Sequence, residues 1–153
     1  MISEKIIQQS LFHFYNQLNH KLIVPNIYLH YSEADLITVQ ASGYVNEIEI
    51  KLTHADFKRD FKKRKHHYMV EASLTKTRLH TPNYFWFCIP RDLLSKIHFD
   101  FVPEDYGMIL VNENGQRPEI HKRAKIMHRN KVTEKQIRQI ARSLMFKMWR
   151  FKE

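Results

Sequence analysis

The segment EADLITVQASGYVNEIEIK, residues 33–51, constrains the fold of this chain more than any other part. It holds two strand-like runs, ADLITVQ and YVNEIEIKL, which are joined by the short link Ala41-Ser42-Gly43. Two such runs with so few residues between them predict an antiparallel hairpin. The segment also carries four acids and a lysine, which is unusual for strands that would form part of a core.

The second run separates its residues onto two faces, because side chains alternate along a strand. Ile48 and Ile50 fall on one face, and Glu47, Glu49 and Lys51 fall on the other. One interpretation is that the charged face is solvated, since a Glu-x-Lys triplet alone is common. The other is that the charged groups form a site.

The remaining pattern predicts helices and further strands around this hairpin. Helical periodicity covers residues 3–20, a region from residue 53 to residue 72, and the tail from residue 133. A run interrupted by Pro25 predicts a loop or an edge strand, and residues 83–89 and 107–112 read as buried strands. We therefore expect an α/β fold with a mixed sheet flanked by helices, in a single domain spanning residues 1–153. Its core is expected at about residues 1–115, with a basic C-terminal extension at about residues 116–153 that ends in a helix.

The charge balance favours a polyanionic partner. The chain has 25 Lys and Arg residues against 16 Asp and Glu residues, a formal charge of +9. The segment from Arg117 onward, with 12 basic and three acidic residues, carries this whole excess. DNA is the first candidate partner, an anionic membrane surface is the second, and a merely basic protein is the plain alternative.

Three features predict a cytoplasmic location. Cys88 is the only cysteine, so an internal disulfide is impossible, which suits a reducing compartment. The first residues, MISEKIIQQS, do not form a signal peptide. No apolar run approaches the roughly 18 residues that a membrane span needs, so we expect no membrane-spanning segment. Between the two candidate partners we choose DNA and expect no membrane partner.

The hairpin also predicts a site for a divalent metal. Asp35 begins the first strand, and pairing would bring it close to Glu49 and Lys51. Charges placed among apolar strands require partners. Mg²⁺ takes carboxylate oxygens, backbone carbonyls and water, so Asp35, Glu49 and the carbonyl of Ile50 would supply part of its shell. Lys51 could then orient or deprotonate a water, or neutralise charge on a phosphate.

Asp35 followed by Glu49-Ile50-Lys51 resembles the motif of the PD-(D/E)XK nuclease superfamily. That resemblance implies a restriction-endonuclease-like α-β-β-β-α-β core, phosphodiester hydrolysis with Mg²⁺ or Mn²⁺, and Asp35, Glu49 and Lys51 as catalytic residues. Metal ligation would fall to Asp35, Glu49 and the carbonyl of Ile50. The name-giving motif has a proline before its aspartate, and this sequence has Ala34 at that position.

The helices on either side of the hairpin supply further candidates under the same resemblance. The first helix of the superfamily often adds an acid or an amide to the metal site, and Glu4 is the best match, with Gln8 or Gln9 behind it. The helix after the motif often adds polar or basic residues, and DFKRDFKK offers Asp56, Asp60 and Lys62.

An ordered set of segments is similar, more narrowly, to the MmcB-like group of DNA-repair-associated nuclease-like proteins. The set spans residues 33–112 and comprises ADLI, EIEIK, DFKRDFKK, FWFCIP and VPEDYGMILV. The basic C-terminal extension lies outside it.

The sequence thus predicts a metal-dependent DNA endonuclease in DNA repair, recombination or the processing of phage or mobile-element DNA. Two alternatives stay open: a catalytically inactive nuclease-fold protein that binds DNA or acts as an adaptor, and a role with RNA or a protein partner through the tail. A homodimer is also left open. The residues predicted to contact nucleic acid are Lys62, Lys63, Lys65, His66, Arg123 and Lys125.

Overall fold

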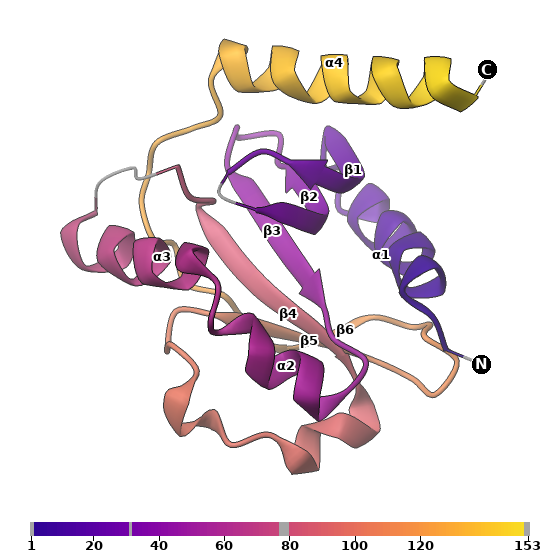
Figure 1. Cartoon of the computed structure of the whole chain (residues 1–153), viewed down its shortest axis with the longest axis vertical. Helices are drawn as coiled ribbons and strands as arrows, with labels where there is room; N and C mark the ends of the chain where they lie inside the picture. The colour runs from indigo at the N-terminus through magenta and orange to yellow at the C-terminus, as the bar shows by residue number, and fades with distance from the viewer. Residues whose placement is uncertain (1, 31, 77–79, 152–153) are drawn as a thin grey trace.

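A six-stranded mixed sheet forms the centre of the protein (Figure 1), as seen in a computed structural model that describes residues 2–30, 32–76 and 80–151. The strands are β1 (Leu22–Tyr28), β2 (Glu33–Val39), β3 (Val45–Ile50), β4 (Tyr84–Pro90), β5 (Gly107–Val111) and β6 (Glu119–Lys122). The helices are α1 (Glu4–Gln17), α2 (His54–Asp60), α3 (Arg64–Thr75) and α4 (Glu134–Phe151), with short 3₁₀ turns η1 (Arg91–Lys96) and η2 (Phe99–Phe101).

The strands lie in the sheet in their order along the chain. β2 pairs antiparallel with both β1 and β3. β3, β4 and β5 are parallel, and β6 pairs antiparallel with β5 at the far edge. The predicted hairpin is confirmed, with Leu36 opposite Ile48 and Val39 opposite Val45. The expected α/β class is confirmed, and the elements from α1 to β4 follow the expected α-β-β-β-α-β order, with the second helix in two pieces.

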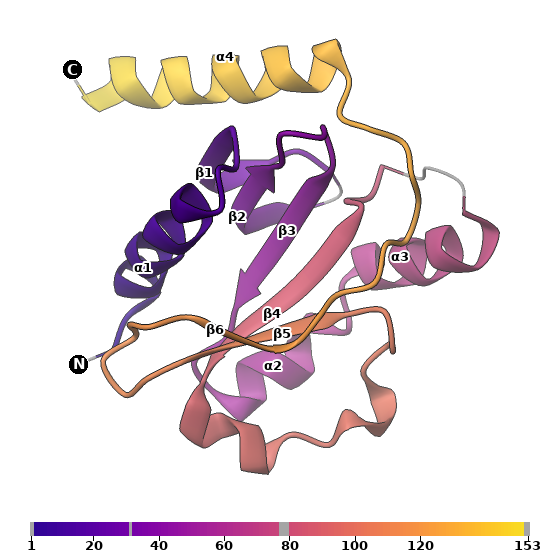
Figure 2. The ribbon, with the colours of Figure 1, turned by 180° about the vertical axis from the view of Figure 1, so that it is seen from behind.

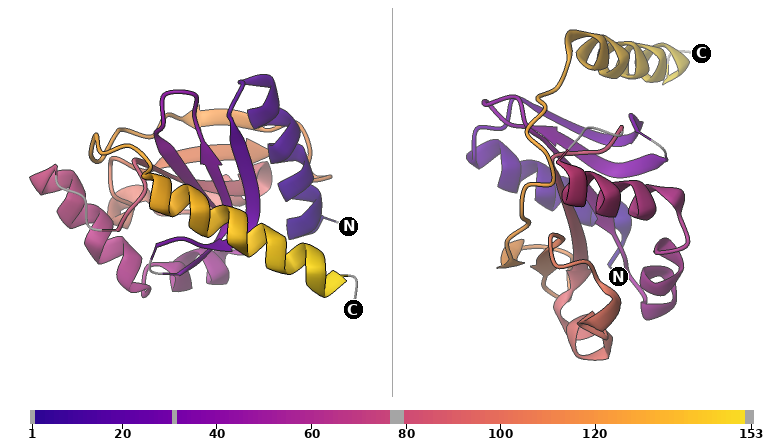
Figure 3. Two further views of the ribbon diagram at one scale, coloured as in Figure 1. Left: turned by 90° about the horizontal axis from the view of Figure 1, so that it is seen from above. Right: turned by 90° about the vertical axis from the view of Figure 1, so that its left-hand side faces the viewer.

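Helices cover both faces of the sheet, as Figures 2 and 3 show from behind, from above and from the side. On one face Ile7 and Leu11 of α1 pack with Ile48 of β3. On the other face Phe57 of α2 and Met69 of α3 pack with aromatic residues of β4. Strands buried on both faces read as continuous apolar runs, which is why residues 84–90 are so rich in aromatics.

Side-chain caps fix the starts of the first two helices. The side chain of Ser3 accepts a hydrogen bond from the backbone N–H of Ile6, and Thr53 Oγ1 accepts one from the N–H of Asp56. Each side chain satisfies an amide that has no partner inside its own helix.

The prediction of one helix from residue 53 to residue 72 is wrong. α2 ends at Asp60, α3 begins at Arg64, and Lys63 between them has an extended backbone (φ −71°, ψ 140°). This break turns the first residues of α3 toward the sheet, so that Lys65 is buried rather than aligned with its basic neighbours.

The two edges of the sheet differ in how well the sequence predicts them. β1 is an edge strand that contains Pro25 opposite Leu36, a position that tolerates proline because an edge strand has one unpaired side. β6 was not expected, and it ties the basic extension to the sheet by pairing with β5.

The predicted C-terminal helix is confirmed as α4, which lies beyond the ends of β1 and β2 (Figure 1). Its Ile140 packs with Ile37 and Val39 in a third apolar cluster. None of the helices described here is long and apolar enough to cross a membrane.

Candidate functional site

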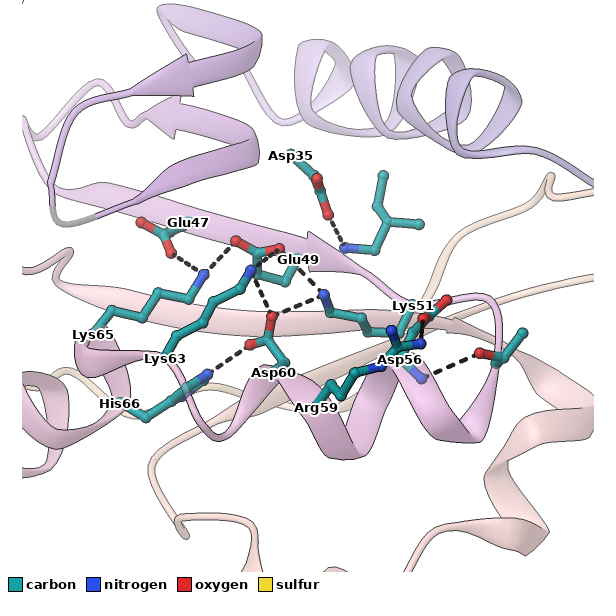
Figure 4. Close-up of polar contacts among 12 residues, drawn as sticks. Asp35, Glu47, Glu49, Lys51, Asp56, Arg59, Asp60, Lys63, Lys65 and His66 are labelled. Carbon is teal, nitrogen blue, oxygen red and sulfur yellow. Dashed lines mark hydrogen bonds and ion pairs between the residues drawn. The ribbon is translucent and has the colours of Figure 1, made fainter.

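The predicted motif residues meet in one pocket beside the C-terminal end of β3. Asp35 comes from β2, Glu49 and Ile50 come from β3, and Lys51 follows directly (Figure 4). The pocket has a volume of about 290 Å³. Residues of α1, of α2 and of the link between α2 and α3 complete its lining: Glu4, Asp56, Arg59, Asp60 and Lys63.

The hairpin register brings Asp35 to Glu49. Because Leu36 lies opposite Ile48, the next positions outward along the two strands are Asp35 and Glu49, and they share a face. Asp35 Oδ2 accepts a hydrogen bond of 2.7 Å from the backbone N–H of Ile50. The two carboxyl groups also lie close enough to interact electrostatically.

The first helix contributes to this pocket, as the resemblance implied. Glu4 lines the pocket, and its negative charge acts on Asp35. One turn later, Gln8 Nε2 donates a 2.9 Å hydrogen bond to the backbone carbonyl of Asp35, which ties α1 to the strand that carries the acid.

Glu49 is buried among cations. Its side chain is 2% exposed, and its carboxylate contacts the Lys65 ammonium at Oε1. The ammonium groups of Lys51 and Lys63 lie 3.7 Å and 4.0 Å from Oε2. The interpretation of this strand face as solvated is therefore wrong, because its acids are enclosed and ion-paired.

Asp60, at the end of α2, completes the cluster. Its Oδ1 lies 2.8 Å from Lys51 Nζ and 2.9 Å from Lys63 Nζ. Its Oδ2 lies 2.6 Å from Nε2 of His66, whose Nδ1 is 2.7 Å from the hydroxyl of Tyr106. A continuous polar network therefore runs from the pocket into the core beneath α3.

Glu47 also belongs to the cluster, although it does not line the pocket. Lys65 Nζ lies 3.1 Å from its Oε2, and His30 Nδ1 lies 3.4 Å from its Oε1. Lys65 thus bridges two acids on the same face of β3. The idea that Glu47 is solvated is wrong, because it is 2% exposed.

The surroundings of the acids raise the pKa values of Glu49 and Asp35 and lower that of Glu47. Burial raises the pKa of Glu49 to about 8, because the repulsion from Asp35, Glu47 and Asp60 adds to burial and together they outweigh Lys65. Burial likewise raises the pKa of Asp35, despite the bond from Ile50. Burial opposes ionisation of Glu47 as well, but Lys65 and His30 prevail and lower its pKa to about 2.

Asp60 and Lys51 hold each other in the charged form. Burial disfavours the Asp60 carboxylate, but the bond from His66 and the charges of Lys65 and Lys51 lower its pKa well below the ordinary value. Burial also disfavours the Lys51 ammonium, and Asp60 more than reverses this, so the pKa of Lys51 is raised. Lys51 is therefore a cation at neutral pH.

The prediction that Lys65 and His66 contact nucleic acid is wrong. Lys65 is 3% exposed and lies between Glu47 and Glu49, and His66 is 5% exposed and lies between Asp60 and Tyr106. Both side chains are buried and paired with other residues of the protein, so neither reaches a phosphate.

The other predicted contacts lie on the surface. Lys62 and Lys63 are exposed, and Lys63 lines the pocket. Arg123 and Lys125 are exposed too, but they follow β6 at the end of the sheet where Met108 pairs with Lys122, opposite the end that carries the pocket. The structure therefore does not bring them to the motif residues.

The donor set suits a divalent cation in type and in charge. Asp35, Glu49 and the Ile50 carbonyl offer the oxygen ligands that Mg²⁺ and Mn²⁺ take, with water completing the shell. The cluster holds four carboxyl groups, Asp35, Glu47, Glu49 and Asp60, and three ammonium groups. Burial raises the pKa values of Asp35 and Glu49, so a cation bound beside them would stabilise their ionised forms. Within the described ranges, no group of three or more His, Cys, Asp or Glu side chains is arranged to hold a metal ion.

Sequence reasoning missed the network below the pocket. The segment DFKRDFKK suggested Asp60, and the structure places Asp60 at the pocket. Nothing in the sequence indicated that Lys65, His30 and Tyr106 belong to the network beneath it. A usable signal was present, since two acids spaced two apart on an otherwise apolar strand require buried cations.

Comparisons with known proteins bear on the fold alone. No family model and no curated protein matches the chain. One solved structure that is similar is the SPO1766 protein of unknown function from Silicibacter pomeroyi, with a TM-score of 0.61 and 14% sequence identity, covering 90% of this chain and 83% of that one. This likeness shows that the α/β arrangement occurs in another protein.

Proposed function

We propose that this protein is a metal-dependent nuclease that hydrolyses phosphodiester bonds in DNA, in repair, recombination or the processing of phage or mobile-element DNA. The observation that carries the proposal is the meeting of Asp35, Glu49 and Lys51 in one pocket. Exposed cations at the same pocket, Arg59 and Lys63, suit an approaching phosphate.

The roles follow from the geometry. Mg²⁺ or Mn²⁺ would be held by Asp35, Glu49 and the carbonyl of Ile50. When bound, such an ion lowers the pKa of a coordinated water and offsets charge on the phosphate. Lys51 serves as a fixed positive charge that orients a water or stabilises the phosphate, because a lysine with a raised pKa is a poor base.

A second candidate is a catalytically inactive DNA-binding or adaptor protein with the same fold. The observation that favours it is the internal neutralisation of the acids, since Lys65 contacts Glu49 while Lys51 and Lys63 both pair with Asp60. An acid already paired with lysines binds a metal less readily than a free one.

A cleavage assay separates the two. Labelled single-stranded, duplex, flap and junction DNAs are incubated with Mg²⁺, Mn²⁺ or chelator, using wild type and Lys51→Ala. A matched control is Lys96→Ala, which removes an exposed lysine of η1 outside the pocket. The nuclease predicts cleavage that needs metal, vanishes in Lys51→Ala and persists in Lys96→Ala.

Glu49→Gln serves as a second variant that keeps the side-chain volume, and thermal melting confirms that each variant is folded. Tight DNA binding without cleavage under either metal would contradict the nuclease and support the adaptor. Cleavage that survives in folded Lys51→Ala and Glu49→Gln would place the activity elsewhere.

A further inference from the structure

A second hollow adjoins the candidate site. It lies between α1 and the strands β1 and β2, and its volume is about 590 Å³, twice that of the site pocket. We call it the α1–β1 groove. Figure 1 shows α1 running alongside β1 and β2, on the side of the sheet opposite α2 and α3.

The groove lies next to the site, and two residues of α1 connect them. Glu4 lines both hollows. Gln8 lines the groove and joins its two sides, since its Nε2 donates to Asn26 Oδ1 at 3.1 Å and to the backbone carbonyl of Asp35 at 2.9 Å. A molecule held in the groove therefore lies next to the strand that carries Asp35.

The walls of the groove have the chemistry of a base-binding pocket. Phe12, Ile23, Pro25 and Leu36 supply apolar surface, and the Phe12 side chain is 45% exposed although it is a large aromatic ring. Side-chain amides complete the wall, and an amide offers both a donor and an acceptor, as the edge of a nucleobase does. Such a combination of stacking surface and amides suits an aromatic heterocycle.

Positively charged side chains lie at the rim of the groove, where the backbone of a bound DNA strand would pass. Lys5 lines the groove from α1. At the β1 end, Lys147 of α4 donates to the backbone carbonyls of Pro25 and Asn26, which places its ammonium beside two groove residues. An apolar floor with cations at its rim is the arrangement by which proteins bind single strands.

We propose that the α1–β1 groove binds the base of an unpaired nucleotide next to the phosphate at the site, so that the substrate is DNA with a single-stranded segment. The proposal rests on the proposed function for the phosphate at the site. A base inside a duplex is stacked and paired, and it enters a pocket only after leaving the helix. The groove therefore discriminates between single-stranded and duplex DNA.

Binding in chelator tests the groove without cleavage. The probe is a fluorescein-labelled DNA strand of about twelve nucleotides, alone or in a blunt duplex, measured by fluorescence anisotropy at fixed salt. Phe12→Ala is expected to weaken single-strand binding roughly tenfold, as loss of a stacking platform does, and to leave duplex binding unchanged. Phe101→Ala is the matched control, because Phe101 is 44% exposed and lines a different pocket.

Base removal gives a sharper readout. Strands with one abasic position at a time are expected to show one position where wild type loses affinity and Phe12→Ala does not. Equal loss for single strand and duplex, or no loss in folded Phe12→Ala, would overturn the inference. Tighter binding of an RNA of the same sequence would overturn the assignment to DNA.

The outcomes separate this inference from the proposed function. Metal-dependent cleavage by wild type, with unchanged single-strand binding in Phe12→Ala, would refute the groove and leave the nuclease standing. Selective single-strand loss in Phe12→Ala, with no cleavage by wild type under any metal, would support the groove and refute the nuclease.

Discussion

Lys51 Nζ lies 2.8 Å from Asp60 Oδ1, which links the residue after β3 to the last residue of α2. The Asp60 side chain is inaccessible to solvent, and that of Lys51 is 12% exposed. The second oxygen of Asp60 is held by His66. Asp60 therefore positions the ammonium of Lys51 beside Glu49, although Asp60 is not part of the sequence motif.

Asp60→Asn is expected to weaken both stability and cleavage. The substitution leaves Lys51 without its nearest anionic partner in a poorly solvated place, and breaking a buried pair from one side costs about 3 kcal/mol. Urea unfolding measures that change in free energy, and kcat for DNA cleavage is expected to fall because the Lys51 ammonium is no longer held in place.

The matched control for stability is Asp56→Asn, one turn earlier on α2; cleavage is not compared, because Asp56 lines the pocket. Asp56 pairs with Arg59 on the surface, with side chains 47% and 69% exposed, and such a pair contributes about 0.5 kcal/mol. Equal losses of unfolding free energy in the two variants would show that the position of Lys51 does not depend on Asp60.

Lys63→Ala is expected to weaken DNA binding more than Lys125→Ala does. Both lysines are exposed and each pairs with a carboxylate, Asp60 or Glu104, but only Lys63 lines the pocket. Each lost phosphate contact reduces the slope of log K against log salt by about 0.9 for duplex DNA. Anisotropy titrations over a salt series measure this slope. A larger change in Lys125→Ala would instead locate the DNA near β6.

The site geometry could be predicted from the sequence because it depends on local rules. Alternation along a strand and the short link Ala41-Ser42-Gly43 are sufficient to place Asp35 beside Glu49, and the observed register does so. The caps at Ser3 and Thr53 depend on local sequence as well, because each joins residues three apart.

The burial of Lys65 could not be predicted in the same way. Six of the eight residues from Lys58 to Lys65 are basic, which is typical of a solvated helix face, and no glycine or proline marks the break at Lys63. The break is stabilised by the ion pairs that Lys65 forms with two acids of β3, more than ten residues away in sequence. Such pairs are tertiary, so helical periodicity gives no sign of them.

His20 is expected to make stability depend on pH. Partial burial lowers its pKa from 6.5, and its Nδ1 lies 2.8 Å from Thr38 Oγ1. Because the folded pKa lies below the unfolded one, the stabilising contribution is present above pH 6.5 and is lost as the pH falls through the folded value.

The measurement compares melting temperatures of wild type and His20→Gln from pH 5 to pH 8. The difference between them is expected to favour wild type at the upper end and to shrink at the lower end. His13→Gln, which removes an exposed histidine of α1, controls for the loss of a histidine in general. A difference that grows as the pH falls would contradict the lowered pKa.

Metal binding is expected to stabilise the fold through Asp35. A ligand that binds only the folded state adds about 2.7 kcal/mol when its free concentration is one hundred times its Kd. Thermal melting in Mg²⁺, Mn²⁺ or chelator measures this without any requirement for cleavage. Asp35→Asn is expected to abolish the shift, because the amide has no charge to offer and Asp35 is one of the carboxylates in the predicted shell. Asp92→Asn, an exposed acid of η1, is expected to keep it. A shift of equal size in both variants would mean that the cation binds outside the pocket, and the cluster of carboxyl groups around Glu49 would then have a purely structural role.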